Sequence, residues 1–344
     1  VEGAEAEVFG GIVGVEVDDE GTIHVLDRQA NELRAFAADG THLWTVGGQG
    51  EGPGEYMNAN GLAWLPPDSL LVIDQRGNRY SVLADDGGFV RSVPRSLGFY
   101  SWAFRGGVAE GWVYETSSIG RGDERTPVLL GTNLRKEPAG GRRESSVEPT
   151  VPAVDTIALP ATGASAYESF SVRNARGGMV MGVPFTPSAV YHLDLEGKLW
   201  HGHGSQPRIF QSTLAGDTVL EVVFEAEPMP VTPQELSEWE ASEAVRRFRE
   251  MGGELELGRI PEAKPYFDGL YRDREGFLWI SVPGGAYQVR FAILDPDGRF
   301  MGEVAAEGMN RATWVDPVVR NGRLHLVGRD ELDVERVYVF EIRK

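Results

Sequence analysis

The stretch IVGVEVDDEGTIHVLDRQANELRAFAADGTHLWTVG, residues 12–47, decides the fold. It contains four short apolar runs, which are Val13–Val17, Thr22–Leu26, Leu33–Ala37 and His42–Val46. Clusters of Asp, Asn and Gly separate the runs, and apolar and polar residues alternate within them. Alternation of this kind between turn-forming clusters is typical of antiparallel strands joined by tight turns. Four such strands in a row predict one blade of a β-propeller.

The same unit recurs along the chain, and the turn between its first two strands gives the spacing. We place this turn at Gly21, Asp68, Gly111, Gly177, Gly276 and Gly322. Three of the five intervals are 43 to 47 residues long, which is the length of one four-stranded blade. The other two intervals, of 66 and 99 residues, must contain insertions. The sequence therefore predicts an all-β fold, with residues 1–344 forming a single six-bladed propeller domain of four-stranded antiparallel blades.

Two insertions interrupt the repeat. The first, residues 135–166, is rich in Pro, Gly, Ser and charge, and we expect an exposed loop with one short strand at Val154–Leu159. The second, residues 227–265, contains a helix predicted over Pro233–Met251, which begins with a Thr-Pro-Gln-Glu capping box. Apolar residues recur in this helix at helical spacing. We expect it to cover apolar surface at one end or side of the propeller, with docking of a partner as the alternative.

The two ends of the chain predict how the ring closes. The last blade begins near Thr313, and the sequence stops one strand short of a complete blade. Residues Glu5–Gly10 resemble the outer-strand ending at Trp44–Gly48. We therefore expect the N-terminal strand to complete the last blade, because a closed ring leaves only short and protected strand edges.

Composition restricts the class of partner and the compartment. The chain has 33 Lys and Arg against 52 Asp and Glu, and its net charge of −19 disfavours nucleic acids and anionic membrane surfaces. It contains no cysteine, which excludes disulfide bonds, thiol nucleophiles and thiolate metal sites. No apolar run reaches the roughly 18 residues that span a bilayer. Because the chain starts at Val1 rather than Met, we expect a processed, exported protein of the periplasm or cell envelope.

Three segments resemble a known propeller family. Residues Gly47–Trp64, GGQGEGPGEYMNANGLAW, resemble the blade junction of NHL-repeat propellers, and the first blade is similar to the core pattern of that repeat. Residues Lys264–Leu270, followed by DREGFLWI, resemble a group of exported bacterial six-bladed propellers. The resemblance covers blades one, two and five, whereas blades three and four lack the typical Val-x-Asp strand ending. It implies the fold and leaves the function open, because relatives include binding scaffolds, lactonases and lyases.

The resemblance also raises the question of a metal. Enzymatic six-bladed relatives hold a central calcium ion with acidic and amide side chains near the starts of the innermost strands. If calcium is bound here, the resemblance points to Asn60, Glu168, Asp268 and Asp316 as its ligands. Calcium takes six to eight oxygen ligands, and our alignment puts only Asn60 and Asp268 directly at strand starts. The sequence therefore predicts no metal and no other cofactor.

Histidine and hydrolase motifs give little support for catalysis. His201 and His203 share one face of a predicted outer strand in blade four, because side chains alternate along a strand. They would need further ligands to bind zinc or copper, and His192 on the neighbouring strand is the one candidate, so a solvated strand face is the simpler interpretation. The motifs G-x-S-x-G and H-E-x-x-H are absent.

Aromatic residues concentrate where the innermost strands are predicted to begin, near one mouth of the central channel. Aromatic walls with a few polar groups suit sugars, peptides or apolar ligands, whereas packing between blades is the alternative explanation. If a ligand binds at this mouth, the sequence predicts that its lining comprises Tyr100, Trp102, Arg105, Tyr167, Asp268 and Trp314.

These observations favour a non-catalytic exported propeller that acts as a protein-binding or scaffold module, for example an accessory subunit of a cell-envelope complex. The insertions 135–166 and 227–265 are the predicted partner surfaces, because the blades form the common ring and the inserted segments distinguish one propeller from another. One alternative is a calcium-dependent lactonase- or lyase-like enzyme at the central channel. The other is a carbohydrate or small-ligand sensor at the aromatic mouth. The sequence identifies no catalytic residue.

Overall fold

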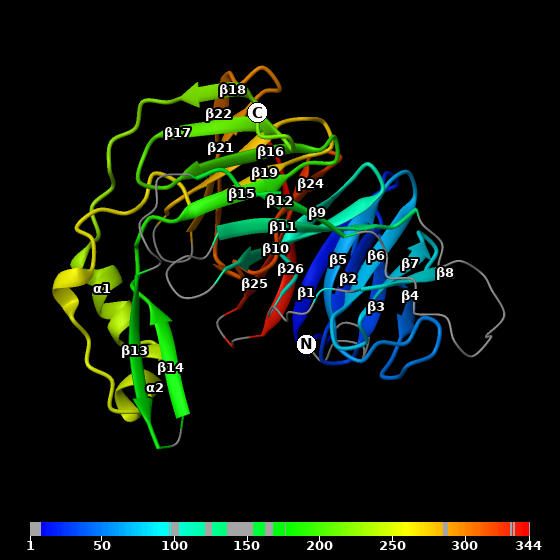
Figure 1. Cartoon of the computed structure of the whole chain (residues 1–344), viewed down its shortest axis with the longest axis horizontal. Coiled ribbons are helices and arrows are strands. Elements are labelled where there is room, and N and C mark those ends of the chain that lie inside the picture. Colours follow the sequence, from blue (N-terminus) through cyan, green and yellow to red (C-terminus); the bar gives the residue numbers. More distant parts are fainter. Residues whose placement is uncertain are drawn as a thin grey trace.

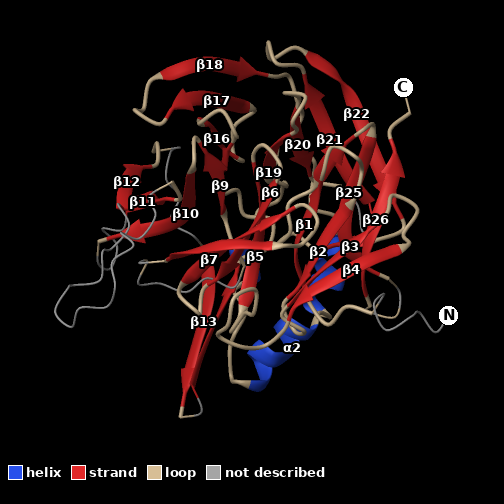
Figure 2. Cartoon of the chain, turned by 90° about the vertical axis from the view of Figure 1, so that its right-hand side faces the viewer, coloured by secondary structure: helices blue, strands red, loops and turns tan. Residues whose placement is uncertain are grey.

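Six antiparallel sheets stand around a central axis in the computed structural model (Figures 1 and 2). The structure describes residues 8–95, 97, 103–120, 126–135, 154–161, 168–175, 177–284, 288–330, 332 and 334–343. The first three blades consist of β1 (Ile12–Val17), β2 (Ile23–Asp27), β3 (Glu32–Phe36) and β4 (His42–Gly47); β5 (Ala59–Leu65), β6 (Ser69–Asp74), β7 (Arg79–Ala84) and β8 (Phe89–Pro94); and β9 (Gly106–Ala109), β10 (Trp112–Ile119), β11 (Thr126–Asn133) and β12 (Val154–Ala158).

The last three blades follow the same pattern, with the innermost strand first in the chain. They consist of β15 (Ala189–Leu193), β16 (Lys198–His203), β17 (Arg208–Thr213) and β18 (Thr218–Val223); β19 (Gly269–Arg272), β20 (Leu278–Val282), β21 (Gln288–Leu294) and β22 (Phe300–Glu307); and β23 (Asn310–Arg311), β24 (Val318–Arg320), β25 (Arg323–Arg329) and β26 (Glu335–Glu341). In blade six, β23 and β24 both pair with β25 and together form the inner strand. The six-bladed propeller predicted from the sequence is confirmed.

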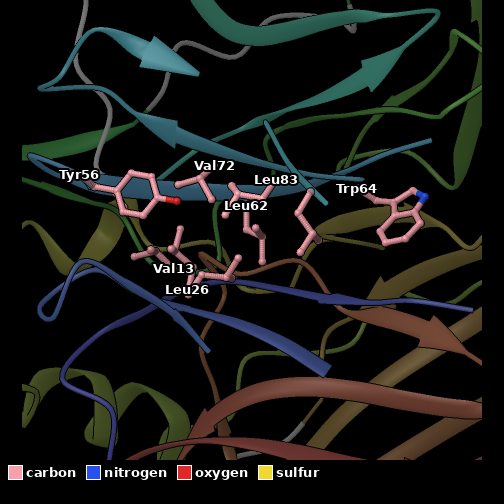
Figure 3. Close-up of a cluster of buried hydrophobic side chains, with 10 residues drawn as sticks. Val13, Leu26, Tyr56, Leu62, Trp64, Val72 and Leu83 are labelled. Atoms are coloured by element: carbon pink, nitrogen blue, oxygen red, sulfur yellow. The ribbon is translucent and has the colours of Figure 1, made fainter. Parts of the chain in front are cut away.

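Packing between neighbouring blades explains the burial of the strands. The inner strands of blade one are buried on both faces, whereas β4 at the rim alternates between partly buried and exposed residues. Apolar side chains from blades one and two fill the wedge between them (Figure 3). Burial of this apolar surface is the main term that stabilises the ring. The cluster includes Val13, Leu26, Leu33, Tyr56, Leu62, Trp64, Val72 and Leu83.

The ring closes where blade six meets blade one. Apolar side chains of both blades form one cluster at this seam. The backbone N–H of Ile12 donates to Glu335 Oε2 at 2.6 Å, and Trp314 Nε1 donates to the Ile12 carbonyl at 3.1 Å. Residues 8–10 adopt no strand, with Phe9 packed edge-on against Phe36 at 5.9 Å between ring centroids. The rest of the predicted closing strand lies outside the described residues, so closure by that strand stays a prediction.

Blade four differs from the sequence prediction. We assigned its first two strands to the segment around Gly177, but β13 (Ser169–Asn174) and β14 (Gly177–Gly182) pair only with each other in a separate sheet. The fourth blade is instead built from β15 to β18. A hairpin has the same local pattern inside or outside the ring, which is why the alternation misled the assignment. His201 and His203 therefore lie on the second strand of blade four and not on its outer strand.

The hairpin carries the helices and forms an arm that stands away from the ring (Figure 1). We define the arm as β13 and β14 together with the segment 229–264. The predicted helix is divided into α1 (Pro233–Glu240) and α2 (Glu243–Glu250), because Ser242 starts a new helix by accepting the Val245 N–H. The capping box at Thr232 is confirmed, and a 3₁₀ turn follows at Leu257–Arg259.

The helices cover the hairpin and not the ring, which corrects the placement expected for them. Phe248 of α2 is fully buried and packs with Phe170 of β13 and with Val183. The arm thus has an apolar core of its own. An isolated antiparallel β-bridge joins Pro230 and Ala263 at the base of the arm. Lys264 forms an ion pair with Glu235 at the same place. None of the helices that the structure describes has the length and hydropathy needed to cross a membrane.

The first insertion is described only in part. The short strand expected at Val154–Leu159 is present as β12, which is the outer strand of blade three. Residues 136–153 and 162–167 lie outside the described part of the chain. The loop predicted for this insertion therefore stays a prediction.

Candidate functional site in the central channel

A turn motif repeated in three blades positions the side chains of the channel. It reads Asp-x-Glu-Gly-x-(Leu/Ile)-(Trp/His) and begins at Asp18, Asp194 and Asp273. In each copy, the Asp Oδ1 accepts the backbone N–H four residues later at 2.8 Å. The Oδ2 of the same Asp lies 2.8 to 3.4 Å from a ring nitrogen six residues later, which belongs to His24, Trp200 or Trp279. The carboxylate thereby fixes the turn and the second strand together.

The residue two positions before each motif Asp lies on the wall of the channel. These residues are Glu16 on β1, His192 on β15 and Tyr271 on β19. Because the three turns have the same geometry, equivalent positions on the inner strands lie at equivalent places around the ring. They line one cavity of about 170 Å³ to which all six blades contribute. Asp316, between β23 and β24, reaches the same cavity.

Glu16 is the carboxylate with the most strongly altered acidity in this cavity. Its Oε1 accepts the Trp64 N–H at 3.0 Å, and its Oε2 lies 3.4 Å from Nη2 of Arg274. The pKa of Glu16 is raised to about 7, mainly by burial; the charge of Asp316 acts in the same direction, whereas Arg274 and the Trp64 N–H act against it. Glu16 is therefore close to half-protonated at neutral pH.

His192 and Tyr271 are both held in their neutral forms. His192 Nε2 accepts the backbone N–H of Arg272 at 3.0 Å, which assigns the proton of the neutral ring to Nδ1. Burial lowers the pKa of His192, against the opposing effect of Asp316 and Asp194. Burial raises the pKa of Tyr271, whose hydroxyl accepts a hydrogen bond from Arg311 at 2.8 Å. His192 thus presents a neutral imidazole beside the cavity.

Asp316 is an exposed carboxylate on the same wall. Its charge raises the pKa values of Glu16 and Tyr271, and it favours the protonated form of His192. It is therefore electrostatically close to side chains from three other blades. Within the described residues, no hydrogen bond or ion pair of the Asp316 side chain is seen. This carboxylate is available to a ligand.

Arginines line the end of the channel where the motif turns lie. Arg272 pairs with Asp194 at 2.7 Å and with Glu196 at 3.0 Å. Arg274 pairs with Glu16, and also with Asp19 at 3.3 Å. The guanidinium of Arg274 lies over the ring of Trp64, at 4.1 Å from the ring centroid. The positive charge at this end is therefore engaged in ion pairs and in a cation–π contact.

A second ion-pair set joins three blades at the same end. Arg320, from blade six, pairs with Asp19 of blade one and with Glu275 of blade five, the latter at 3.4 Å. Asp19 therefore bridges Arg320 and Arg274 across the seam of the ring.

The structure places the residues predicted for the aromatic mouth as follows. Trp314 lines the cavity, whereas Arg105 and Asp268 are not among its lining residues. Tyr100, Trp102 and Tyr167 lie outside the described residues.

The four conditional calcium ligands are not brought together. Asp316 is in the channel, Asn60 is fully buried on β5, and Glu168 lies beside the arm, 3.7 Å from Arg259. Asp268 precedes β19, where its backbone N–H donates to the Ser281 carbonyl. In the described part of the chain, no cluster of three His, Asp or Glu side chains is arranged to hold a metal ion.

The two histidines of β16 have a structural explanation. Both side chains are 6% exposed, so the solvated strand face expected for them is wrong. His201 Nε2 lies 2.9 Å from Ser212 Oγ, and His203 Nδ1 lies 2.7 Å from Ser205 Oγ. Burial lowers the pKa of each imidazole. They act as buried hydrogen-bonding groups within blade four.

Sequence reasoning missed the channel positions of Glu16 and Tyr271, and treated His192 only as a neighbour of His201. The signal was present in the repeated turn. DDEGTIH at residue 18 and DREGFLW at residue 273 were both used to mark blades, but DLEGKLW at residue 194 was not recognised as a third copy. Aligning the three copies puts Glu16, His192 and Tyr271 in one column.

Comparisons with known proteins agree on the fold. A family model described as a 6-bladed beta-propeller (DUF5128) matches residues 2–82. A solved structure of a DUF4221-family member from Bacteroides vulgatus is 10% identical, with a TM-score of 0.54, and the match covers 97% of this chain and 94% of that one. This chain is a six-bladed β-propeller. The propeller fold implied by the NHL-repeat resemblance is thereby confirmed.

Two further solved structures match with lower scores. A putative exported protein from Bacteroides fragilis is 10% identical, with a TM-score of 0.42 over 96% of this chain and 77% of that one. A streptogramin B lyase is 12% identical, with a TM-score of 0.42 over 96% of this chain and 94% of that one. No curated protein sequence matches. These two matches carry no argument about the function of this chain, which has to be argued from the site.

Proposed function

We propose that this propeller is a non-catalytic binding protein that holds a small ligand in its central channel. The convergence of Glu16, His192 and Asp316 on one cavity carries this proposal. Binding pockets are mostly apolar and contain a few convergent polar groups, and this cavity also has Trp64 and Trp314 in its wall. A cavity of about 150 Å³ is large enough for benzene, so 170 Å³ suits a ligand of roughly that size.

The polar groups of the cavity favour binding over covalent catalysis. Its described lining contains no Ser, Thr, Cys or Lys, so a covalent mechanism would have to use a carboxylate, His192 or Tyr271 as nucleophile. Both oxygens of Glu16 are already engaged, and His192 Nε2 accepts a backbone hydrogen bond. A lyase- or lactonase-like enzyme, with Asp316 and His192 as general base and acid, is the alternative. Turnover of a lactone or cyclic ester that is lost in Asp316→Asn would favour that alternative.

Thermal denaturation tests the proposed binding. A compound present at 100 times its dissociation constant stabilises the folded state by about 2.7 kcal/mol, which raises the Tm of a chain of this length by about 4 °C. We expect such a rise for at least one member of a panel of benzene-sized compounds of different charge. We also expect it to disappear in the Glu16→Gln, Asp316→Asn double variant. No rise with any compound, or an equal rise in the double variant, contradicts a channel site.

The arm supports a second function, the docking of a protein partner. It has its own apolar core and stands away from the ring (Figure 1). Val180 of β14 is 66% exposed on the face opposite the helices. Segments that project from a rigid frame are common partner surfaces, and within the described residues the two-stranded sheet has no further strand on its edges, which suits strand addition. On the resemblance to exported propellers, we place both functions in the periplasm or cell envelope, which fractionation of the source cells tests.

Substitution of Val180 tests the arm. We expect Val180→Glu to abolish recovery of any partner captured from envelope extract by the wild-type chain, because it puts a charge in the centre of the exposed face. The matched control is Val219→Glu on β18 of the ring, where the valine is 54% exposed. Recovery of the same partner by both variants contradicts docking at the arm.

A further inference from the structure

We propose that the ligand of the central channel is a small organic cation, an amine with an apolar body of about benzene size. This inference rests on the proposed function and names the chemical class that the cavity selects. It follows from which charges in the channel are neutralised, from what covers the aromatic rings, and from the charge of the whole chain.

The two arginines that line the cavity are already paired with carboxylates. Arg272 is held between two carboxylates, at 2.7 and 3.0 Å, and Arg274 is held between two others, at 3.4 and 3.3 Å. An anionic ligand would have to displace these pairs to reach a guanidinium. It would also approach Asp316 with a charge of the same sign.

The negative groups are not fully neutralised. Asp316 has no ion-pair partner within the described residues, and it is electrostatically coupled to Glu16 across the cavity. An ammonium group between them would pair with Asp316 and with Glu16, whose cation among the described residues, Arg274, is shared with Asp19. His192, a neutral imidazole beside Asp316, adds no repelling charge. Charge-assisted hydrogen bonds of this kind are about twice as strong as neutral ones.

The remaining wall suits the apolar body of such an amine. Phe104, Leu62, Val13 and Val318 contribute apolar surface from four different blades. The cavity therefore has a charged side and an apolar side, which is the pattern that an amphipathic amine requires. A strongly hydrated metal cation would gain nothing from the apolar side.

Guanidinium groups of the chain already cover the aromatic rings of the channel. A guanidinium lies over the ring of Trp64 at 4.1 Å, over that of Tyr271 at 5.2 Å, and over that of Trp314 at 5.4 Å. Each pairing places positive charge on the negative face of an aromatic ring. The net charge of −19 also attracts cations toward the protein over long range and repels anions. The net charge of the chain and the carboxylate of Asp316 thus select the same sign of ligand.

Isothermal titration of the full chain with three compounds of matched shape tests the class. Benzylamine, benzyl alcohol and benzoate share one ring and differ in charge. We expect benzylamine to bind at least tenfold more tightly than benzyl alcohol, and benzoate to show no binding. In Asp316→Asn, we expect the affinity for benzylamine to fall at least tenfold. Asp217→Asn, in an exposed turn of blade four, changes the net charge equally and should alter the affinity less than twofold.

Each failure has a separate meaning. The proposal of a cationic ligand is wrong if benzyl alcohol or benzoate binds as tightly as benzylamine. It is also wrong if only neutral or anionic members of the thermal panel stabilise the chain. In both cases the proposed binding site in the channel stands. If Asp316→Asn and Asp217→Asn weaken benzylamine equally, net charge and not the cavity determines binding, and the assignment to this site is wrong. The comparison among ligands uses the wild-type chain and does not depend on how well a variant folds.

Discussion

Replacing Glu115 with alanine is expected to lower the free energy of unfolding by about 3 to 5 kcal/mol, the cost of leaving a buried charge without its partner. Glu115 on β10 and Arg95 after β8 are 1% and 4% exposed. Their pairing is bidentate, with Arg95 Nε donating to Oε1 at 2.7 Å and Nη2 donating to Oε2 at 2.9 Å. The hydroxyl of Tyr80, on β7, donates to the same Oε1 at 2.5 Å. The network therefore joins blades two and three.

Chemical denaturation measured by tryptophan fluorescence tests this expectation. Loss of Glu115 leaves a guanidinium and a phenol in the seam between two blades, where water cannot replace the lost partner. The matched control is Asp297→Ala, which removes an exposed ion pair of 3.3 Å with Arg299 and should change the stability by less than about 0.5 kcal/mol. A Glu115→Ala effect as small as that of the control would show that the seam does not depend on this network.

A double variant separates the charge from the packing. We expect Arg95→Met with Glu115→Leu to recover much of the stability lost in Glu115→Ala, because apolar groups of similar size often replace a buried ion pair with little cost. Tyr80 would then lack its acceptor, so recovery should be incomplete. A double variant no more stable than the single one would assign the loss to packing.

The sequence predicted correctly the parts of the fold in which the turn-forming residues and the alternation of apolar residues indicate the same strands. In blade one, Gly21 has a φ of +90°, and Asp18 accepts two backbone N–H groups of the turn, so the turn chemistry alone fixes the hairpin. The same applies to the turn at Asp273. Alternating strands between such turns have one compatible arrangement, which is a four-stranded blade.

Blade four shows where local signals are not sufficient. The hairpin β13–β14 has alternation and a turn with Gly177 at a φ of +139°, as a blade hairpin would. What keeps it out of the ring is burial of Phe170 against Phe248, which is 78 positions away in the sequence. Contacts of this range depend on the whole fold and leave no local pattern. The third Asp-x-Glu-Gly turn, at Asp194, was the better marker.

The channel could be predicted only in part for a related reason. A glutamate, a histidine and a tyrosine on alternating strands have nothing in common until their turns are aligned, so Glu16, His192 and Tyr271 were not recognised as one group. Asp316 lies between β23 and β24, outside any regular strand, two residues after Trp314, whose indole N–H donates to the Ile12 carbonyl of the first blade. Trp314 was predictable because it precedes an inner strand.

Substitution of Glu16 by glutamine is expected to change how stability depends on pH. Burial raises the pKa of Glu16 to about 7 from an unfolded value of 4.5. Between these values, the folded chain holds a proton that the unfolded chain has lost, so wild-type stability falls as pH rises from 4.5 to 7. At 1.36 kcal/mol for each pH unit, the contribution is up to about 3 kcal/mol. A glutamine side chain at this position cannot titrate, so the variant should gain stability relative to the wild type over this range.

The measurement is the free energy of unfolding of both chains at pH 5, 6, 7 and 8, and the difference between them is the quantity of interest, because all other titrating groups cancel. A difference that stays constant across this range would show that Glu16 is ionised throughout, held by Arg274, whose guanidinium lies 3.4 Å away.

The protonation of Glu16 also has a consequence for the affinity of the proposed ligand. An ammonium group favours the ionised form of Glu16, so benzylamine should bind more tightly as pH rises through 7, by up to about tenfold between pH 6 and pH 8. In Glu16→Gln, the contribution of this carboxyl group to the pH dependence of stability and the pH dependence of the affinity should disappear together, because one carboxyl group in the channel causes both.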